Sequence, residues 1–143
     1  MAEMIAIAAD HGGYDLKTLL IPEIAALGFE ALDLGTNGPE SVDYPDFAAV
    51  LARAIESGQV ARGVLVCGTG IGIAIAANRH RGVRAAVCHD ATTARLARQH
   101  NDANVLALGG RVIGAEVARD CLRIFLRTEF EGGRHSRRIA KMS

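Results

Sequence analysis

Short apolar segments alternate with helix-like segments about five times along this chain, and this alternation constrains the fold more than any other feature. The strand-like segments are residues 4–9, 29–34, 64–66, 83–87 and 105–108. Between them, and over residues 115–130, apolar residues recur at helical spacing. The alternation predicts an α/β fold, a Rossmann-like three-layer sandwich with a parallel sheet of about five strands and helices on both faces. The length suits one domain, expected to span residues 1–143.

Polar and glycine residues follow several of the predicted strands. Asp10 and His11 follow the first strand, and a polar segment at 100–104 (H-N-D-A-N) follows a predicted helix at 92–99. An open parallel sheet binds its ligands at the carboxyl ends of its strands. We therefore expect His11 and His100 to lie in loops that face a ligand, although structural hydrogen bonding is the commoner role of a single histidine.

A glycine loop, C-G-T-G-I-G at 67–72, connects the buried strand at 64–66 to an Ala/Ile-rich helix. Such a loop presents backbone N–H groups at a helix N-terminus and can bind an anion. It is not a Walker A loop, because no lysine follows Gly72. The third glycine of a dinucleotide fingerprint is also absent, since Ile73 stands in its place. A tight turn with a purely structural role remains an alternative.

Cys67, the first residue of this loop, is the strongest candidate for chemistry. Free cysteines are usually small buried apolar residues, which is our interpretation of Cys88 and Cys121. Cys67 differs because glycines and a helix N-terminus follow it directly, and these surroundings favour the thiolate. Thr69 could hydrogen-bond this sulfur or a substrate. We interpret Cys67 as a catalytic base, with a buried structural role as the alternative.

Composition argues against several functional classes. The formal net charge is zero, tryptophan is absent and aromatic residues make up 4% of the chain, which disfavours nucleic-acid binding. No apolar run reaches membrane-spanning length, and the first residues do not resemble a signal peptide. The three cysteines show no C-x-x-C spacing. We therefore expect free thiols and a cytoplasmic protein.

The histidines and the basic tail leave alternatives open. The five histidines lack the close paired spacing of a zinc site, so no metal is expected, although a site assembled on folding stays possible. Arg134 and Arg138 are four residues apart and share a face if the tail is helical. Two guanidinium groups on one face suit a phosphate monoester, and a solvated basic terminus is the alternative.

Taken together, these motifs resemble the B-type ribose-5-phosphate isomerase family, which includes galactose-6-phosphate and allose-6-phosphate isomerases. The resemblance covers almost the whole chain and rests on motifs in family order. These are A-A-D-H-G-G-Y at 8–14, V-D-Y-P-D at 42–46, C-G-T-G-I-G at 67–72, A-R-Q-H-N-D-A-N-V-L at 97–106, G-G-R-V-I-G at 109–114 and E-G-G-R-H at 131–135. One branch of the family uses a glutamate four residues after the cysteine position. Ile71 stands there, so the chain resembles the cysteine branch.

The resemblance implies roles for individual residues. Cys67 would abstract a proton, and His100 would open the furanose ring. For the reaction that this implies, the hydroxyl of Thr69 and the loop amides can supply donors where oxyanion charge develops. Arg134 and Arg138 would hold the phosphate. The residues implied to line the substrate are Asp10, His11, Gly68, Gly70, Ile71, Gly72, Asn101 and Arg111. The family also implies a homodimer or a dimer of dimers, in which each site takes residues from two subunits.

The reaction implied is the interconversion of ribose 5-phosphate and ribulose 5-phosphate through a cis-enediolate. It requires a base, donors for an oxyanion and an anchor for the phosphate, and no cofactor. Isomerisation of allose 6-phosphate, galactose 6-phosphate or a tetrose phosphate is the alternative within this class. A non-catalytic Rossmann-like module that binds a metabolite is the alternative from another class, although it would not need Cys67, His100 and the arginine pair together.

Overall fold

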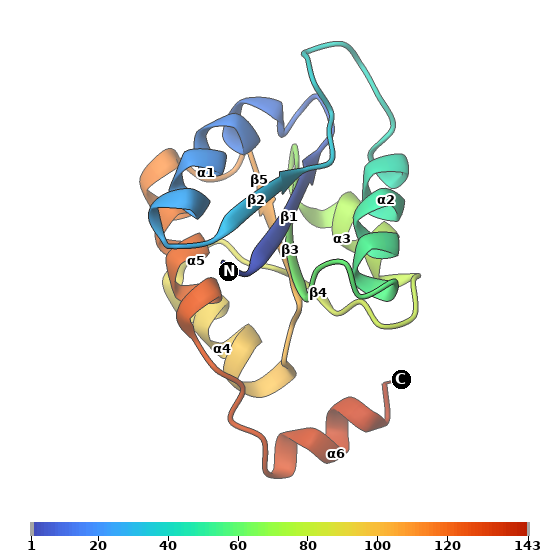
Figure 1. Ribbon diagram of the computed structural model, residues 1–143, viewed down its shortest axis with the longest axis vertical. Helices are drawn as coiled ribbons and strands as arrows, with labels where there is room; N and C mark the ends of the chain where they lie inside the picture. The colour runs from blue at the N-terminus through green and yellow to red at the C-terminus, as the bar shows by residue number, and fades with distance from the viewer. Residues whose placement is uncertain (1, 143) are drawn as a thin grey trace.

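The computed structural model describes residues 2–142, which form a five-stranded parallel sheet with the order β2-β1-β3-β5-β4 (Figure 1). The strands are β1 (Met4–Ala9), β2 (Glu30–Asp33), β3 (Arg62–Cys67), β4 (Ala85–Val87) and β5 (Val105–Gly109). All four pairings are parallel. The predicted fold class is therefore confirmed.

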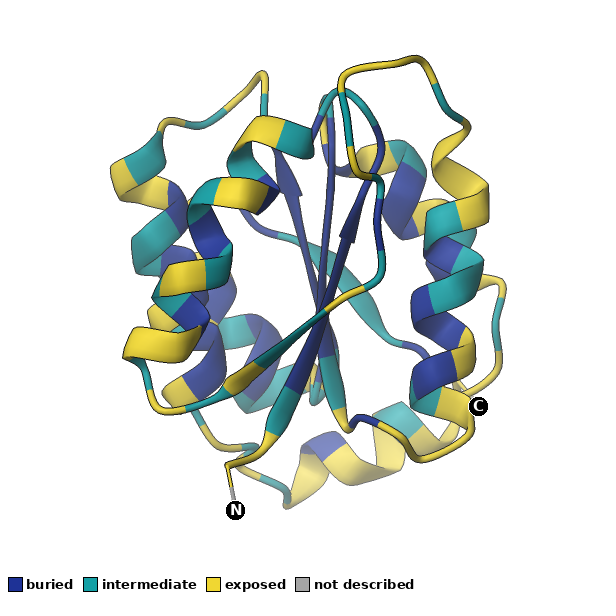
Figure 2. Ribbon diagram, turned by 45° about the horizontal axis from the view of Figure 1, so that its top comes forward, coloured by how far each residue is buried: buried dark blue, intermediate teal, exposed yellow. Residues whose placement is uncertain are grey.

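Helices cover both faces of the sheet. The helices α1 (Tyr14–Ala26), α4 (Ala91–Asn101) and α5 (Ala115–Arg127) contribute to one apolar core, and α2 (Tyr44–Glu56) and α3 (Ile71–Asn78) contribute to the other. Figure 2 shows buried residues along the sheet and on the helix faces turned toward it. The last helix, α6 (Arg134–Ala140), lies beyond the end of α4, at the bottom of Figure 1.

The central strands are apolar because both of their faces are covered. From Ile5 to Ala9 in β1, and through the whole of β5, each residue is buried. The edge strands β2 and β4 are less buried and shorter. Continuous branched and small apolar residues are the pattern of a parallel sheet between two helical layers.

Several predicted boundaries differ from the structure. Residues 100–104 were expected to form a turn, but His100 and Asn101 form the last turn of α4. Pro22 lies inside α1, which continues to Ala26. The helix predicted at 115–130 ends at Arg127. The tail, predicted as a short helix or coil, is helical in α6. Within residues 2–142, no helix is long and apolar enough to cross a membrane.

The order of the strands places a topological switch point between β1 and β3. The chain leaves β1 through α1 on one face of the sheet and enters β3 from α2 on the other face. In open α/β sheets, such a reversal opens a crevice at the carboxyl ends of the strands. The loop after β1 and the glycine loop after β3 border this crevice.

Candidate active site

Three glycine-containing loops meet at the carboxyl ends of β1, β3 and β5. They are residues 10–13, 67–72 and 109–111. A backbone hydrogen bond joins Gly110 N to Cys67 O at 2.9 Å, and another joins Arg111 N to Gly68 O at 2.9 Å. A Cβ on Gly110 would lie 2.8 Å from the carbonyl oxygen of Gly12. Glycine is needed here because the backbones of separate loops touch one another.

Cys67 is the last residue of β3, and its side chain lies within the glycine loop. The Gly70 backbone N–H donates a hydrogen bond to Cys67 Sγ across 3.1 Å. Thr69 Oγ1 accepts a hydrogen bond from Ile71 N at 3.1 Å, which leaves its hydroxyl hydrogen for another partner. The sulfur therefore lies within the loop, in contact with a backbone donor at the start of α3.

Gly70 gives the loop its shape at the start of α3. Its φ is +81°, and a Cβ there would lie 2.9 Å from the carbonyl carbon of Leu108. The N–H groups of the first helical turn have no acceptor within the helix, which leaves those of Gly72 and Ile73 available to a ligand at this end of α3. A Cβ on Gly68 would lie 3.3 Å from Arg111 Nη1, so this guanidinium lies over the loop. The result is a group of donors around the Cys67 thiol.

Asp10 and His11 extend the same site. Asp10 is buried, and its Oδ1 accepts a hydrogen bond from Gly13 N at 3.1 Å. The Val42 N–H donates to His11 Nδ1 across 3.1 Å, so the neutral ring carries its hydrogen on Nε2. A cavity of about 480 Å³ is lined by Asp10, His11 and residues 41–46. We call this set, with the loops at 67–72 and 109–111, the thiol end.

Sequence reasoning missed the contribution of the segment after β2. It assigned no site residue between positions 35 and 45, but the folding of this segment over His11 sets the tautomer of that histidine. Tyr44, at the start of α2, lies against the glycine loop, because a Cβ on Gly72 would be 2.8 Å from its Cζ. The V-D-Y-P-D motif at 42–46 was the available signal for both contacts.

His100, Asn101, Arg134 and Arg138 lie at the opposite end of the molecule, which we call the histidine end. His100 and Asn101 end α4, and the chain enters β5 at Val105. Cys67 pairs with Gly109 at the other end of β5. The length of that strand, roughly 13 Å, therefore separates the end of the sheet that holds Cys67 from the end that holds His100. Apart from Asn101, the structure therefore brings the predicted site residues together in two groups and keeps these groups apart within one chain.

At the histidine end, the rings of His100 and His135 stack with centroids 4.4 Å apart and planes at 15°. Glu131 Oε1 lies 4.0 Å from His100 Nε2 and 3.6 Å from His135 Nε2. Burial, together with the charges of His100 and Arg134, lowers the pKa of His135 despite the nearby Glu131. Arg134 and Arg138 are exposed on α6 beside this pair. Sequence reasoning gave no site role to His135 or Glu131, although both belong to the E-G-G-R-H motif at 131–135.

Asn101, the last residue of α4, faces a different space. It is exposed and lines a cavity of about 400 Å³ beside β4, together with Asn78, Met142 and residues 83–86. In one chain it is therefore remote from the thiol end.

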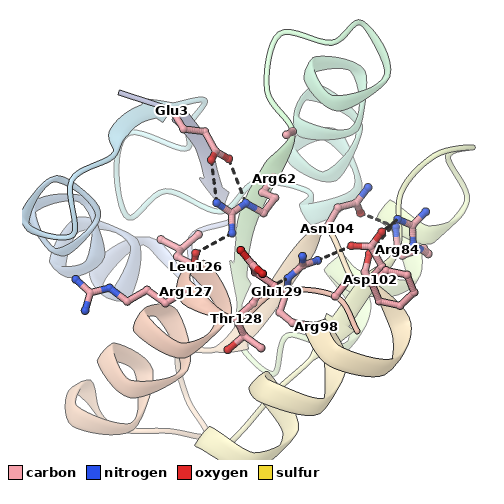
Figure 3. A pocket seen from close by; sticks show the side chains of 12 residues that line it. Glu3, Arg62, Arg84, Arg98, Asp102, Asn104, Leu126, Arg127, Thr128 and Glu129 are labelled. Carbon is pink, nitrogen blue, oxygen red and sulfur yellow. Dashed lines mark hydrogen bonds and ion pairs between the residues drawn. The ribbon is translucent and has the colours of Figure 1, made fainter. Parts of the chain in front are cut away.

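A cavity of about 550 Å³ near the amino ends of the strands is rich in arginine but does not form part of either group (Figure 3). Arg62 binds Glu3 at 3.0 Å, and Arg98 binds Asp102 at 2.9 Å and the carbonyl oxygen of Ala103. Arg84 donates to the carbonyl oxygen of Asp102. Because protein acceptors already occupy these guanidinium groups, we interpret the cluster as structural.

Comparisons with known proteins agree with one another. The sequence profile of a family described as Ribose/Galactose Isomerase matches residues 5–142. Ribose-5-phosphate isomerase B of Escherichia coli is 46% identical over 135 residues, covering 94% of this chain and 91% of that protein. D-erythrulose-4-phosphate isomerase of Pectobacterium atrosepticum is 44% identical over 139 residues, with 96% and 91% covered. The structure of ribose-5-phosphate isomerase B from Clostridium thermocellum matches with a TM-score of 0.96 and 51% identity, covering 97% of this chain and 94% of that one.

Proposed function

This chain belongs to the ribose/galactose isomerase family, and we therefore propose that it interconverts ribose 5-phosphate and ribulose 5-phosphate. The observation that carries the proposal is the match, over nearly the full length, to a sequence and a structure that are both named ribose-5-phosphate isomerase B. The enzyme is an aldose–ketose isomerase, and the details of its site that follow are part of the proposal.

Cys67 acts as the base in this mechanism. Its thiolate removes the proton from C2 of the open-chain aldose. The C2–H electrons form the C1–C2 double bond of a cis-enediolate, while the π electrons of the C1 carbonyl move onto O1. The thiol then returns the proton to C1, while a proton moves from O2 to O1, which yields the ketose. The hydrogen bond from Gly70 N supports the thiolate between turnovers.

The glycine loop stabilises the enediolate oxygens. The first-turn N–H groups at Gly72 and Ile73 and the free hydroxyl hydrogen of Thr69 point toward the site where this charge develops. Asp10 and the Nε2–H of His11 bind substrate hydroxyl groups from the β1 side. Arg111, which lies over Gly68, adds a positive charge at the same place.

The ring-opening and phosphate-binding roles require a second chain. His100 protonates the ring oxygen, and Arg134 and Arg138 bind the phosphate, but all three lie at the histidine end. We propose a homodimer in which the histidine end of one chain faces the thiol end of the other. Ile71 and Ile75 support this arrangement, because they are 51% and 56% exposed on α3 beside the glycine loop and offer an apolar contact surface.

A tetrose phosphate is the second candidate substrate, because one relative at 44% identity is named D-erythrulose-4-phosphate isomerase. We also propose that the enzyme works in the cytoplasm, where its three free thiols would stay reduced.

A direct isomerase assay tests the proposed function. Purified protein, without added metal, is offered ribose 5-phosphate, erythrulose 4-phosphate, allose 6-phosphate and galactose 6-phosphate in parallel, with Cys67→Ala as the control. We expect ribose 5-phosphate to have the highest kcat/KM and Cys67→Ala to lose this activity. A higher kcat/KM for another sugar would change the substrate, and no turnover of any sugar would favour a binding module. Substantial activity in Cys67→Ala would remove the assignment of the base.

A further inference from the structure

The histidine end holds three potential metal ligands, of which Glu131 and His135 are four residues apart and His100 is distant from both in sequence. One ligand atom from each of His100, Glu131 and His135 can be chosen so that all three lie within 4.8 Å of one another. Glu131 Oε1 is the central atom, at 3.6 Å from one imidazole nitrogen and 4.0 Å from the other. Two imidazoles and a carboxylate are a ligand set that Zn²⁺ accepts in proteins.

The geometry is close to that of a bound site but more open. With ligand bonds of about 2.0–2.1 Å, neighbouring donors in a tetrahedral site lie about 3.4 Å apart. The two donor distances to Glu131 therefore need to shorten by less than about 1 Å, together with a turn of the His100 ring out of its stack. The side chains of His100 and Glu131 are 40% and 51% exposed, so they have room to move. His135 is buried and fixes the third donor.

Backbone contacts hold these three residues in a common frame. The N–H of Glu131 donates to Gln99 O at 3.1 Å, which attaches the segment before α6 to the last turn of α4. Arg98, one residue earlier on α4, donates through Nε to Thr128 O at 3.2 Å. The site is thus prepared by folding, and its ligands need only side-chain movement.

We propose that His100, Glu131 and His135 bind a divalent transition-metal ion of the zinc class, and that this ion inhibits the isomerase. The inhibition rests on the proposed function, because a metal bound to His100 Nε2 occupies the atom that would donate a proton to the ring oxygen. Arg134 and Arg138 repel a cation at this place, so binding is weaker than in a closed four-ligand zinc site. Water molecules complete the coordination.

Metal binding is measured on the intact protein independently of activity. Equilibrium dialysis with Zn²⁺ is expected to give one ion per chain at saturation, and Zn²⁺ should raise the unfolding temperature. Co²⁺ should give the visible absorption of a four- or five-coordinate site. Glu131→Gln and His135→Asn should each weaken binding by about tenfold or more. Because Glu131 is exposed, Glu131→Gln should fold normally, and it therefore tests the site even if His135→Asn fails to fold.

Two controls identify the ligands. Glu56 and His80 form a matched pair on the surface, with 3.6 Å between His80 Nδ1 and Glu56 Oε1. Among residues 2–142, this pair belongs to no group of three potential metal ligands. Glu56→Gln should therefore leave the affinity unchanged. Cys67→Ala should also retain Zn²⁺ binding, which separates the proposed site from capture by the thiolate.

The inhibition is measured with ribose 5-phosphate, each variant being compared with its own metal-free rate. Zn²⁺ should inhibit the unaltered enzyme and Glu56→Gln equally, and Glu131→Gln at least about tenfold more weakly. Binding that is lost in Cys67→Ala, or that persists unchanged in Glu131→Gln, would overturn the site. Binding without inhibition would overturn the competition and count against the role of His100, even if the assignment of ribose 5-phosphate holds.

Discussion

Mixing two inactive variants, one altered at each end of the sheet, tests whether the active site is shared between chains. Cys67→Ala removes the proposed base, and His100→Asn removes the proposed ring-opening acid. In one chain these residues lie at opposite ends of β5, and the length of that strand, roughly 13 Å, separates them. Under the proposed function, they therefore meet across two chains. A dimer that contains one chain of each kind then has one intact site and one site that carries both changes.

The expected activity follows from this geometry. Random reassociation of equal amounts makes half of the dimers mixed, and each mixed dimer keeps one of its two sites. The preparation should therefore recover about one quarter of the unaltered activity. A site built within one chain would carry a fault in every case, and the mixture would then be as inactive as either variant alone.

The assay unfolds and refolds the two variants together, or co-expresses them with different affinity tags, and then measures ribulose 5-phosphate formation. The matched control mixes Cys67→Ala with Asp10→Asn, because both of these residues belong to the thiol end. This pair should not complement. No recovery from the first pair, or equal recovery from the same-end pair, would refute the shared site.

Three further predictions concern the residues that build the fold and the thiol end. Gly70→Ala should destabilise the protein by about 1–3 kcal/mol and reduce activity, because φ is +81° and a Cβ would meet the backbone of Leu108. Urea unfolding measures this loss against Gly114→Ala, whose added Cβ meets no atom within 4 Å and should change stability by less than about 0.5 kcal/mol. Lys17→Met should lower the free energy of unfolding by about 1–3 kcal/mol, because the buried ammonium bonds Asp33 Oδ1 and Thr36 O at 2.7 Å each; an unchanged denaturation midpoint would contradict this. Iodoacetamide at pH 8 should modify Cys67 first, because burial raises the pKa of Cys88 to about 11 and of Cys121 to about 12, so that both remain thiols until the pH approaches those values. Mass spectrometry that finds Cys88 labelled as fast as Cys67 would count against this order of reactivity.

The sheet and the glycine loop were predictable because their signals are local. Branched apolar residues mark β3, three glycines mark the loop, and small apolar residues mark the start of α3. Each signal lies within a few residues of the structure that it predicts. The same holds for the place of Asp10 and His11, because a residue directly after a parallel strand lies at its carboxyl end.

The position of His100 was predicted wrongly, although the topology could have supplied it. A helix that connects two parallel strands returns the chain to the amino end of the sheet. His100 ends α4 just before β5, so it has to lie at the end opposite to Cys67. The expectation of a ligand-facing loop at 100–104 considered the polar composition of the segment and not the direction of the helix.

Other contacts had no local signal. The rings of His100 and His135 stack although 35 positions separate these residues in the chain. Likewise, the hydrogen bond from Val42 to His11 depends on how the segment after β2 folds back over β1. Such contacts depend on tertiary packing, which spacing along one sequence does not encode.

If the active site is shared between two chains as proposed, the separation of the thiol end from the histidine end makes catalysis subject to mass action. Under the proposed function, an isolated chain contains every side chain of the site and still has no working site. The specific activity should therefore fall on dilution below the dissociation constant of the dimer, with the rate then rising as the square of the protein concentration. For this fold, the concentration of the enzyme is itself one of the quantities that determine whether each molecule is active.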